Sequence, residues 1–238
     1  MNQSWSIVVF GYNEEKTISP LIEKIYSFLI SNNLNESEII FIDDGSSDGT
    51  ENIVKDFKRK YEIIKYIRHP KNLGIGPTLL SGYNKADKEN VIAIPADGQF
   101  NIDELNPFIN FSQRSFISFY RQEMKDYTIY RKLITRINKL LNKYFLKLEL
   151  KDINWVKAYK TRDLKEIDIK LRSSLVGSEI CAKLNLKEYV AIEVLSVYHE
   201  RTAGKARGAS IKMISKAVTE LIEIIHIVHR FKKNLAKK

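Results

Sequence analysis

The chain has 238 residues, of which 44% are hydrophobic, and a formal net charge of +10. This length is ample for one globular α/β domain with a sizeable core and marginal for two. The single cysteine, Cys181, excludes an internal disulfide, and the chain opens with no leader of the signal-peptide type. No stretch reaches the roughly 18 to 20 uninterrupted apolar residues that a membrane-spanning helix needs. We therefore expect a protein of a reducing, cytoplasmic compartment.

The positive charge is concentrated in the second part of the chain. Residues 1–100 hold 11 Lys and Arg against 14 Asp and Glu, whereas residues 101–238 hold 28 against 15. A basic surface of this size suits an anionic membrane, a lipid phosphate or a nucleic acid, or it is a solvated surface with no specific partner. No RNA-binding signature or helix-turn-helix pattern accompanies the charge, so we expect no nucleic-acid partner.

Strands and helices alternate along the first hundred residues. Residues 6–10 form an apolar strand, and the loop 11–15 leads into an amphipathic helical pattern. A second apolar strand, 39–42, runs directly into Asp43 and Asp44. In open α/β sheets, ligands bind at the carboxyl ends of the strands, so Asp44 is placed to accept hydrogen bonds from a ribose or a base. A solvated turn after a strand is the simpler alternative.

The same pattern continues through residue 100. The loop 72–76 precedes a helical pattern, and the strand 91–94 delivers the sequence Pro95-Ala96-Asp97-Gly98-Gln99-Phe100. The order β-α-β-α-β predicts an α/β domain with a nucleotide-binding edge.

These four segments together resemble the inverting glycosyltransferases of family 2, and within them the dolichyl-phosphate mannose synthase and polyprenyl-phosphate glycosyltransferase group. The resemblance implies a GT-A (Rossmann-like) α/β domain that binds a nucleotide sugar, with a mixed, mostly parallel sheet and C-terminal amphipathic helices. The group usually has Pro-x-Tyr-Asn-Glu in its first loop, where this chain has Phe10 in place of the proline. By the resemblance, the nucleotide-binding residues are Tyr12, Asn13, Glu14, Ile42, Asp44, Asp97 and Arg207.

A metal site is expected after the third strand. Relatives have Asp-Ala-Asp-x-Gln there, whereas this chain has Pro95 in place of the first aspartate and keeps Asp97 and Gln99. Two oxygen ligands suit a hard ion such as Mg²⁺ or Mn²⁺ whose other positions are filled by diphosphate oxygens and water. The alternatives are that residues 97–98 form only a turn, or that the chain is a catalytically silent nucleotide-binding relative.

Basic residues follow the apolar segment 116–120. Arg121 comes first, and residues 131–148 then have the pattern of a basic amphipathic helix, which either lies in a membrane interface or packs on the sheet. Relatives have an Arg after the strand and an Arg-x-x-x-Ser-Arg pattern near the lipid phosphate. The resemblance therefore implies that the acceptor phosphate binds Arg121, Arg131, Thr135 and Arg136.

Two later segments complete the expected catalytic set. Asp152 is kept where relatives have Asp-x-x-Gly-Phe, although Trp155-Val156 replaces Gly-Phe. Asp152 either contacts the acceptor, as a base where the acceptor is a sugar hydroxyl, or caps a turn and pairs with a neighbouring lysine. After an expected edge strand from residue 190, Arg201 and Gly204 align with the Arg-x-x-Gly-x-Ser-Lys pattern of the relatives, while Ala206 and Arg207 replace its Ser and Lys. This loop either closes over a diphosphate or a lipid phosphate or is a basic loop with no ligand. The resemblance thus implies catalytic roles for Asp97, Asp152, Arg121, Arg131 and Arg201.

Residues 211–231 have a helical pattern in which Ile214, Val218, Leu221, Ile225 and Val228 form one apolar stripe. A second apolar edge makes this helix a candidate contact for a membrane, a membrane-protein partner or a homodimer. We divide the chain into a catalytic domain, 1–210, and a C-terminal helix with a basic tail, 211–238.

The sequence thus predicts a metal-dependent transferase that moves a sugar, with inversion, from a UDP- or GDP-sugar to a polyprenyl phosphate. We expect it to lie peripherally on the inner face of the cytoplasmic membrane. The main alternative is a family 2 transferase that acts on a sugar hydroxyl of a cell-surface glycan.

Overall fold

The computed structural model describes residues 2–121, 140, 142–197 and 211–237, with only the backbone of residues 211–218. A seven-stranded sheet with the order β3-β2-β1-β4-β6-β5-β7 forms the centre of the fold. Strand β6 is antiparallel to both of its neighbours, and the other neighbouring pairs are parallel. The predicted mixed, mostly parallel α/β sheet is confirmed.

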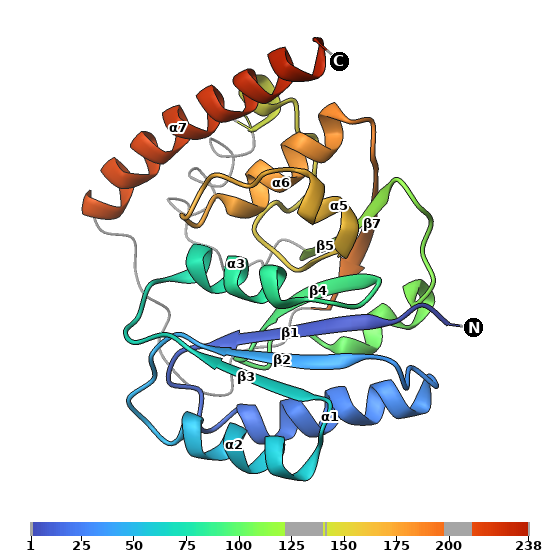
Figure 1. The fold of residues 1–238 in the computed structure, drawn as a ribbon. Helices are drawn as coiled ribbons and strands as arrows, with labels where there is room; N and C mark the ends of the chain where they lie inside the picture. The colour runs from blue at the N-terminus through green and yellow to red at the C-terminus, as the bar shows by residue number, and fades with distance from the viewer. Residues whose placement is uncertain (1, 122–139, 141, 198–210, 238) are drawn as a thin grey trace.

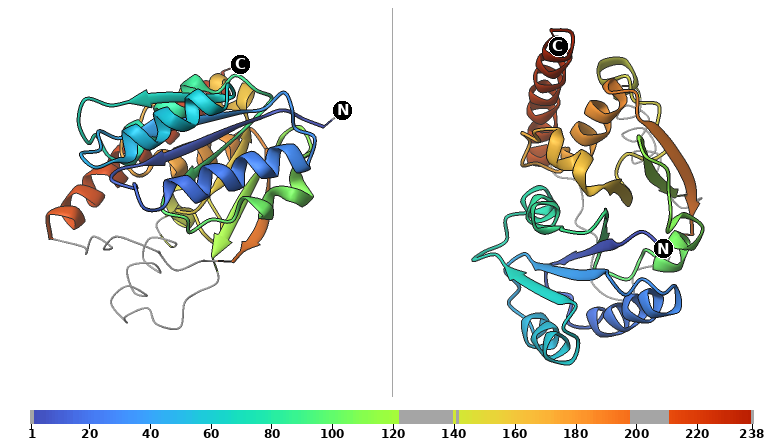
Figure 2. Two further views of the ribbon diagram at one scale, coloured as in Figure 1. Left: turned by 90° about the horizontal axis from the view of Figure 1, so that it is seen from below. Right: turned by 45° about the vertical axis from the view of Figure 1, so that its right-hand side comes forward.

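The helices cover both faces of the sheet (Figure 1). Helices α1 and α2 lie on one face, and α3, α5, α6 and α7 lie on the other, with α7 packed against α6 (Figure 2). The described elements are β1 (Trp5–Gly11), α1 (Ile18–Ser31), β2 (Glu38–Asp43), α2 (Thr50–Lys60), β3 (Ile64–Arg68), α3 (Ile75–Lys85), β4 (Asn90–Pro95), the 3₁₀ helix η1 (Ile102–Phe108), β5 (Ser115–Arg121), β6 (Lys157–Lys160), α5 (Thr161–Glu166), α6 (Val176–Leu186), β7 (Val190–Ser196) and α7 (Ile211–Leu235).

Successive side chains of the central strands point to opposite faces of the sheet, and this divides the core into two layers. In β1, Ile7 and Val9 pack on the α1 side, while Val8 packs on the α3 side. Successive side chains of a strand point to opposite faces, so a strand buried on both faces is apolar throughout. This is why β2 is completely buried and why the sequence shows its apolar run without alternation.

Helix α3 approaches the sheet unusually closely at Gly82. A Cβ atom added there would lie 2.3 Å from Val8 Cγ1 on β1. Only glycine allows this approach, which brings α3 and the preceding loop 72–74 against the carboxyl ends of β1 and β2.

The C-terminal helix differs from the sequence prediction. It extends to Leu235, and among its described side chains Ile224 and Val228 are buried apolar residues, flanked by partly buried Leu221 and Phe231. The two predicted apolar edges therefore form one face, which packs on the domain, because residues three and four apart share a helix face. The side chains of Ile214 and Val218 lie outside the described residues. No helix in the described part of the chain combines the length and the apolarity that crossing a bilayer requires.

Candidate active site

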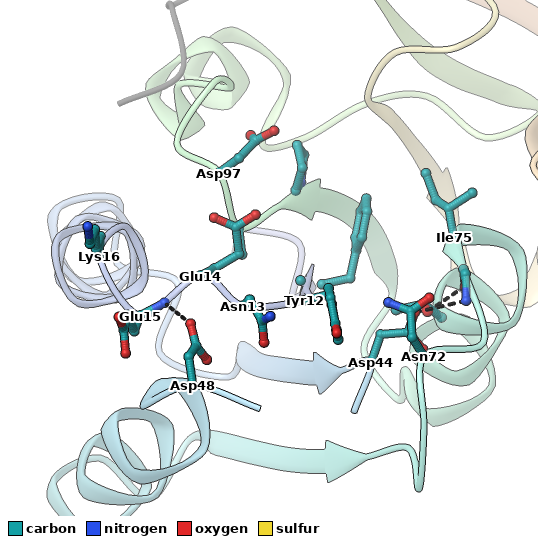
Figure 3. A pocket seen from close by; sticks show the side chains of 16 residues that line it. Tyr12, Asn13, Glu14, Glu15, Lys16, Asp44, Asp48, Asn72, Ile75 and Asp97 are labelled. Carbon is teal, nitrogen blue, oxygen red and sulfur yellow. Dashed lines mark hydrogen bonds between the residues drawn. The ribbon is translucent and has the colours of Figure 1, made fainter. Parts of the chain in front are cut away.

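A cleft of about 650 Å³ opens at the carboxyl ends of β1, β2 and β4 (Figure 3). These three strands are adjacent and parallel, so the loops that follow them meet at one edge of the sheet. The residues that line the cleft are Phe10, Gly11, Tyr12, Asn13, Glu14, Glu15, Lys16, Asp44, Asp48, Asn72, Gly74, Ile75, Thr78, Pro95, Ala96 and Asp97.

The loop after β1 is held rigidly by the loop after β2. Asn13 adopts a left-handed φ of 58°, and its side-chain oxygen accepts a 2.8 Å hydrogen bond from the Ser47 N–H. The main-chain N–H groups of Asn13 and Glu14 donate to the hydroxyls of Ser46 and Thr50. Asparagine tolerates this backbone conformation better than most residues. The main chain of Asn13 and Glu14 thus forms part of the cleft wall.

Asp48 strengthens the same contact between loops. Its carboxylate accepts hydrogen bonds from the N–H of Glu15 and from the N–H and hydroxyl of Thr50. Burial raises the pKa of Asp48, but the hydrogen bonds from Thr50 and Glu15 outweigh burial, and the pKa is lowered overall. Asp48 therefore remains ionised at neutral pH and adds negative charge at the rim of the cleft.

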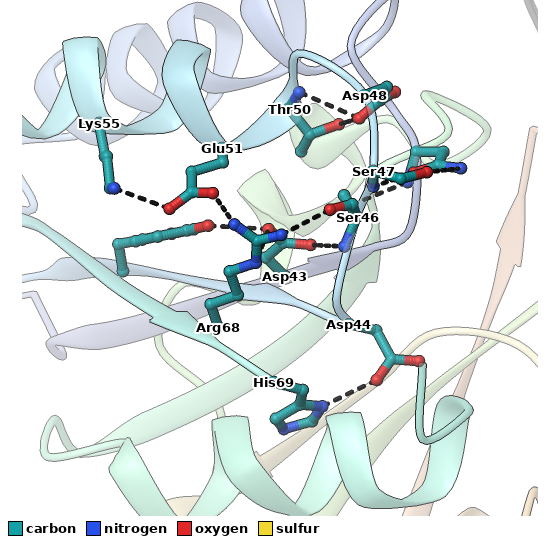
Figure 4. Close-up of polar contacts among 12 residues, drawn as sticks. Asp43, Asp44, Ser46, Ser47, Asp48, Thr50, Glu51, Lys55, Arg68 and His69 are labelled. Carbon is teal, nitrogen blue, oxygen red and sulfur yellow. Dashed lines mark hydrogen bonds and ion pairs between the residues drawn. The ribbon is translucent and has the colours of Figure 1, made fainter. Parts of the chain in front are cut away.

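The adjacent aspartates at the carboxyl end of β2, Asp43 and Asp44, have different surroundings (Figure 4). Asp43 is fully buried, and its carboxylate accepts hydrogen bonds from the Ser46 N–H and the Tyr66 hydroxyl. Burial, together with this bond to Asp43, raises the pKa of Tyr66. Arg68, which forms an ion pair with Glu51, also lies near Asp43. Asp43 therefore stabilises the turn and does not line the cleft.

Asp44 lines the cleft and also holds the loop before α3. Its Oδ1 atom accepts hydrogen bonds from His69 Nδ1 at 2.8 Å and from the Leu73 N–H at 2.9 Å, and its Oδ2 atom accepts one from the Gly74 N–H at 2.8 Å. The Nε2 atom of His69 lies 2.9 Å from the Ser81 hydroxyl on α3. Asp44 is thus fixed in one orientation at the cleft wall.

Asp97 lines the cleft close to the loop after β1. Gly11 lets these two segments approach closely, because a Cβ atom added to Gly11 would lie 2.7 Å from Ala96 Cβ and 3.0 Å from Glu14 Cγ. Asp97 Oδ1 accepts a hydrogen bond from the Gln99 N–H at 3.1 Å, and both residues are buried. Gln99 is not among the residues that line the cleft.

Asp97 is the candidate metal ligand of the cleft. Among the described residues, no group of three or more His, Cys, Asp and Glu side chains is close enough to hold one. A carboxylate in a cleft of this size nevertheless fits a hard divalent ion that takes its remaining ligands from a bound diphosphate and water. The residues present therefore fit a metal ion that enters with the nucleotide.

A second polar cluster surrounds Arg121 at the end of β5. Arg121 Nε lies 2.8 Å from Asp152 Oδ2, and the guanidinium carbon lies 4.5 Å from the centroid of the Trp155 ring. Trp155 Nε1 donates to the Ser196 hydroxyl at 2.9 Å. The Trp155 ring also packs edge to face against Phe100, which lies three residues after Asp97 in the sequence. Asp152 Oδ1 also accepts the Asn154 N–H at 3.0 Å. Asp152 thus caps a turn, as one alternative expected, but its ionic partner is Arg121 and not a neighbouring lysine.

The loop that carries Asp152 rests on a buried lysine that sequence reasoning missed. Lys157 Nζ donates to the main-chain oxygens of Ile153 at 2.6 Å, Trp155 at 3.2 Å and Asp152 at 3.3 Å. Burial lowers the pKa of Lys157. The apolar residues around Lys157 in the sequence gave no sign of this role.

The structure brings most of the predicted nucleotide-binding residues together. Tyr12, Asn13, Glu14, Asp44 and Asp97 line one cleft. The side chain of Ile42 on β2 is fully buried in the core and does not line the cleft. Arg131, Thr135, Arg136, Arg201 and Arg207 lie outside the described residues.

His69 was not predicted from the sequence. It directly follows β3, as Asp44 directly follows β2, and its N–H donates to the Asp43 carbonyl at 2.8 Å. Its position one residue beyond a strand of the same parallel set was the available signal.

The chain is similar to a known protein family and to several proteins of known activity. The model of glycosyl transferase family 2 matches residues 6–166. A dolichyl-phosphate beta-glucosyltransferase of Trichomonas vaginalis is 35% identical over 103 residues, which are 42% of this chain and 31% of that protein. The match therefore spans less than a third of that relative's length.

Two further proteins match over almost the whole chain. A UDP-N-acetylglucosamine–dolichyl-phosphate N-acetylglucosaminyltransferase of Methanococcus voltae is 24% identical over 91% of this chain and 94% of its own. The structure of glucosyl-3-phosphoglycerate synthase from Mycobacterium tuberculosis with Mn²⁺ and UDP has a TM-score of 0.65 at 15% identity, over 95% of this chain and 80% of that one. The last likeness concerns the fold alone. Since the family model matches well over half of the chain, the protein belongs to glycosyl transferase family 2.

Proposed function

We propose that the protein transfers a sugar from a UDP- or GDP-sugar to a polyprenyl phosphate, with inversion at the anomeric carbon. The observation that carries the proposal is the cleft at the carboxyl ends of β1, β2 and β4, where Tyr12, Glu14, Asp44 and Asp97 meet. The names of the Trichomonas and Methanococcus relatives, which both specify dolichyl phosphate, support this acceptor class.

The donor nucleotide would lie along the cleft between its two walls. The nucleoside would contact Tyr12 and Asp44, and the diphosphate would extend toward Asp97. Asp97 would hold Mg²⁺ or Mn²⁺, whose remaining ligands would be diphosphate oxygens and water, and the bound ion would neutralise charge on the leaving diphosphate. The Mn²⁺ in the related synthase structure supports this choice.

Arg121 would orient the acceptor phosphate. An arginine has five N–H donors, and the bonds to Asp152 occupy only Nε and one donor of Nη2, so the remaining donors can bind a phosphate oxygen. A phosphate oxygen attacks the anomeric carbon, the bond to the diphosphate oxygen breaks, and the nucleoside diphosphate leaves with the electron pair. The attacking phosphate is already an anion, so this step needs no base.

A sugar hydroxyl is the alternative acceptor. A sugar hydroxyl requires a base, and Asp152 is the expected one, but its carboxylate binds Arg121 and the Asn154 N–H. A base held in this way is poorly placed to take a proton. The arrangement therefore favours the phosphate acceptor.

A peripheral position on the inner membrane face is part of the proposal. Tyr144 and Phe145 are 73% and 53% exposed, and Lys143 is beside them. Exposed aromatic and basic side chains in one short segment suit the interface of an anionic membrane.

A transfer assay tests the proposed function. The full chain is incubated with Mn²⁺, vesicles containing polyprenyl phosphate, and radiolabelled UDP-glucose, UDP-N-acetylglucosamine or GDP-mannose. We expect label in a lipid-soluble product that mild acid releases as free sugar. Label that appears only in a water-soluble glycan would assign the protein to the hydroxyl acceptor, and no transfer from any donor would contradict the proposal.

A further inference from the structure

The carboxylate of Asp44 has little hydrogen-bonding capacity left for a ligand. Each carboxylate oxygen has two lone pairs. Oδ1 already accepts from His69 Nδ1 and from the Leu73 N–H, so both of its lone pairs are used. Among the described residues, Oδ2 accepts only the Gly74 N–H, so one lone pair remains. Asp44 is 4% exposed and lines the cleft, so the remaining lone pair of Oδ2 is the acceptor that it offers to a ligand there.

His69 is the residue that limits Asp44. Its imidazole is 7% exposed and contacts Asp44 through Nδ1 (Figure 4). On the other side of the ring, Nε2 contacts the Ser81 hydroxyl. Because a carboxylate only accepts hydrogen bonds, Nδ1 carries the proton and donates it to Oδ1. Ser81 on α3 keeps the ring in this position, so His69 cannot turn away when a ligand enters.

The two candidate bases make different demands on such a carboxylate. Guanine presents adjacent donors, the ring N1–H and the exocyclic N2–H, which a carboxylate satisfies only with both oxygens. Uracil presents a single imide N3–H, which one oxygen satisfies. A buried donor left without an acceptor weakens binding roughly tenfold. Asp44 with one remaining lone pair therefore matches uracil and not guanine.

We infer that His69, by occupying Oδ1 of Asp44, makes the site select uridine over guanosine, so that the donor is a UDP-sugar. The inference rests on the proposed function, since it requires that the cleft binds a nucleotide sugar. It assigns His69 as a positioning residue, because it acts on the base through Asp44. The Methanococcus relative, whose name specifies a UDP-sugar, agrees with this choice.

Calorimetric titration of the full chain with UDP and with GDP, each in the presence of Mn²⁺, tests the inference directly. We expect the Kd for UDP to be at least about tenfold lower. Equal affinities, or tighter binding of GDP, would overturn the inference and leave the proposed function standing. Binding of neither nucleotide would overturn both.

A matched pair of variants tests the role of His69. Asn and Leu have nearly the same shape, but only Asn places an N–H donor near the position of Nδ1. His69→Asn should keep the preference for UDP, whereas in His69→Leu the ratio of the two Kd values should fall toward one, because Oδ1 becomes available to guanine. The same ratio in both variants would overturn the role of His69. Circular dichroism confirms that each variant is folded, and the wild-type ratio decides base selection without either of them.

Discussion

Arg121 and Asp152 form a paired ionic contact at the end of β5, in which Nε and Nη2 of the arginine lie 2.8 and 3.3 Å from the two carboxylate oxygens. The planar guanidinium also stacks on Trp155. Such a pair fixes the plane of the arginine, which is the property needed to orient a tetrahedral phosphate.

Asp152→Asn should therefore reduce turnover without abolishing it. The amide loses the ionic contact but leaves Arg121 able to bind phosphate, so we expect roughly a tenfold lower kcat/KM, close to the loss of one charge-assisted hydrogen bond. Steady-state kinetics with polyprenyl phosphate measure this. Complete loss of turnover would instead indicate that Asp152 is a base and that the acceptor is a hydroxyl. Arg121→Lys is the companion variant, and it should raise KM for the acceptor because lysine cannot form the paired contact.

Asp97→Asn should remove metal-dependent nucleotide binding. Asp97 lines the cleft, and in the proposed function it supplies the anionic oxygen for the metal ion, which an amide binds far less well. We expect the extra thermal stabilisation that Mn²⁺ gives in the presence of UDP to disappear, with turnover at least about 100-fold lower.

The control for this variant is Asp103→Asn. Asp103 is half exposed and pairs with Lys24 on the surface, away from the cleft. Asp103→Asn should keep the full thermal stabilisation that Mn²⁺ gives in the presence of UDP. An unchanged Mn²⁺ effect in Asp97→Asn would show that Asp97 does not bind the metal.

Gly82→Ala should destabilise the fold. The added Cβ would lie 2.3 Å from Val8 Cγ1, so α3 must move away from β1 at a cost of about 1–3 kcal/mol. Gly177→Ala in α6 is the matched control, because the nearest contact of its added Cβ is 3.9 Å away and alanine favours a helix by up to about 1 kcal/mol. Urea unfolding measures both free energies. Equal effects of the two substitutions would contradict the close approach of α3 to the sheet.

Lys157→Met should destabilise the loop that presents Asp152 and Trp155. The main-chain oxygens of Asp152, Ile153 and Trp155 would lose their shared donor in a buried position, which costs about 1–3 kcal/mol of unfolding free energy. Lys170→Met, at a lysine whose side chain is 58% exposed, should change the stability by less than about 0.5 kcal/mol. Urea unfolding of both variants checks this, and similar midpoints would contradict the role given to Lys157.

The sequence by itself determined the α/β alternation and the edge of the sheet that carries the site. Buried parallel strands require continuous apolar runs, and loop chemistry follows each run immediately, so Asp44 and Asp97 could be assigned to one cleft from their positions after residues 39–42 and 91–94. The resemblance supplied the family, which the match to residues 6–166 confirms. The helix at the C-terminus was also visible, because a helical apolar period needs no tertiary information.

Only the tertiary structure decided which polar and charged side chains are partners of one another. Asp43 and Asp44 are neighbours in sequence, yet one stabilises a buried turn and the other faces the cleft. His69 meets Asp44, and Arg121 meets Asp152, across 25 and 31 positions of sequence. Such partners depend on which strands are neighbours in the sheet and on how closely α3 approaches it. Hydrogen bonds between distant residues follow from packing and leave no local pattern in the sequence.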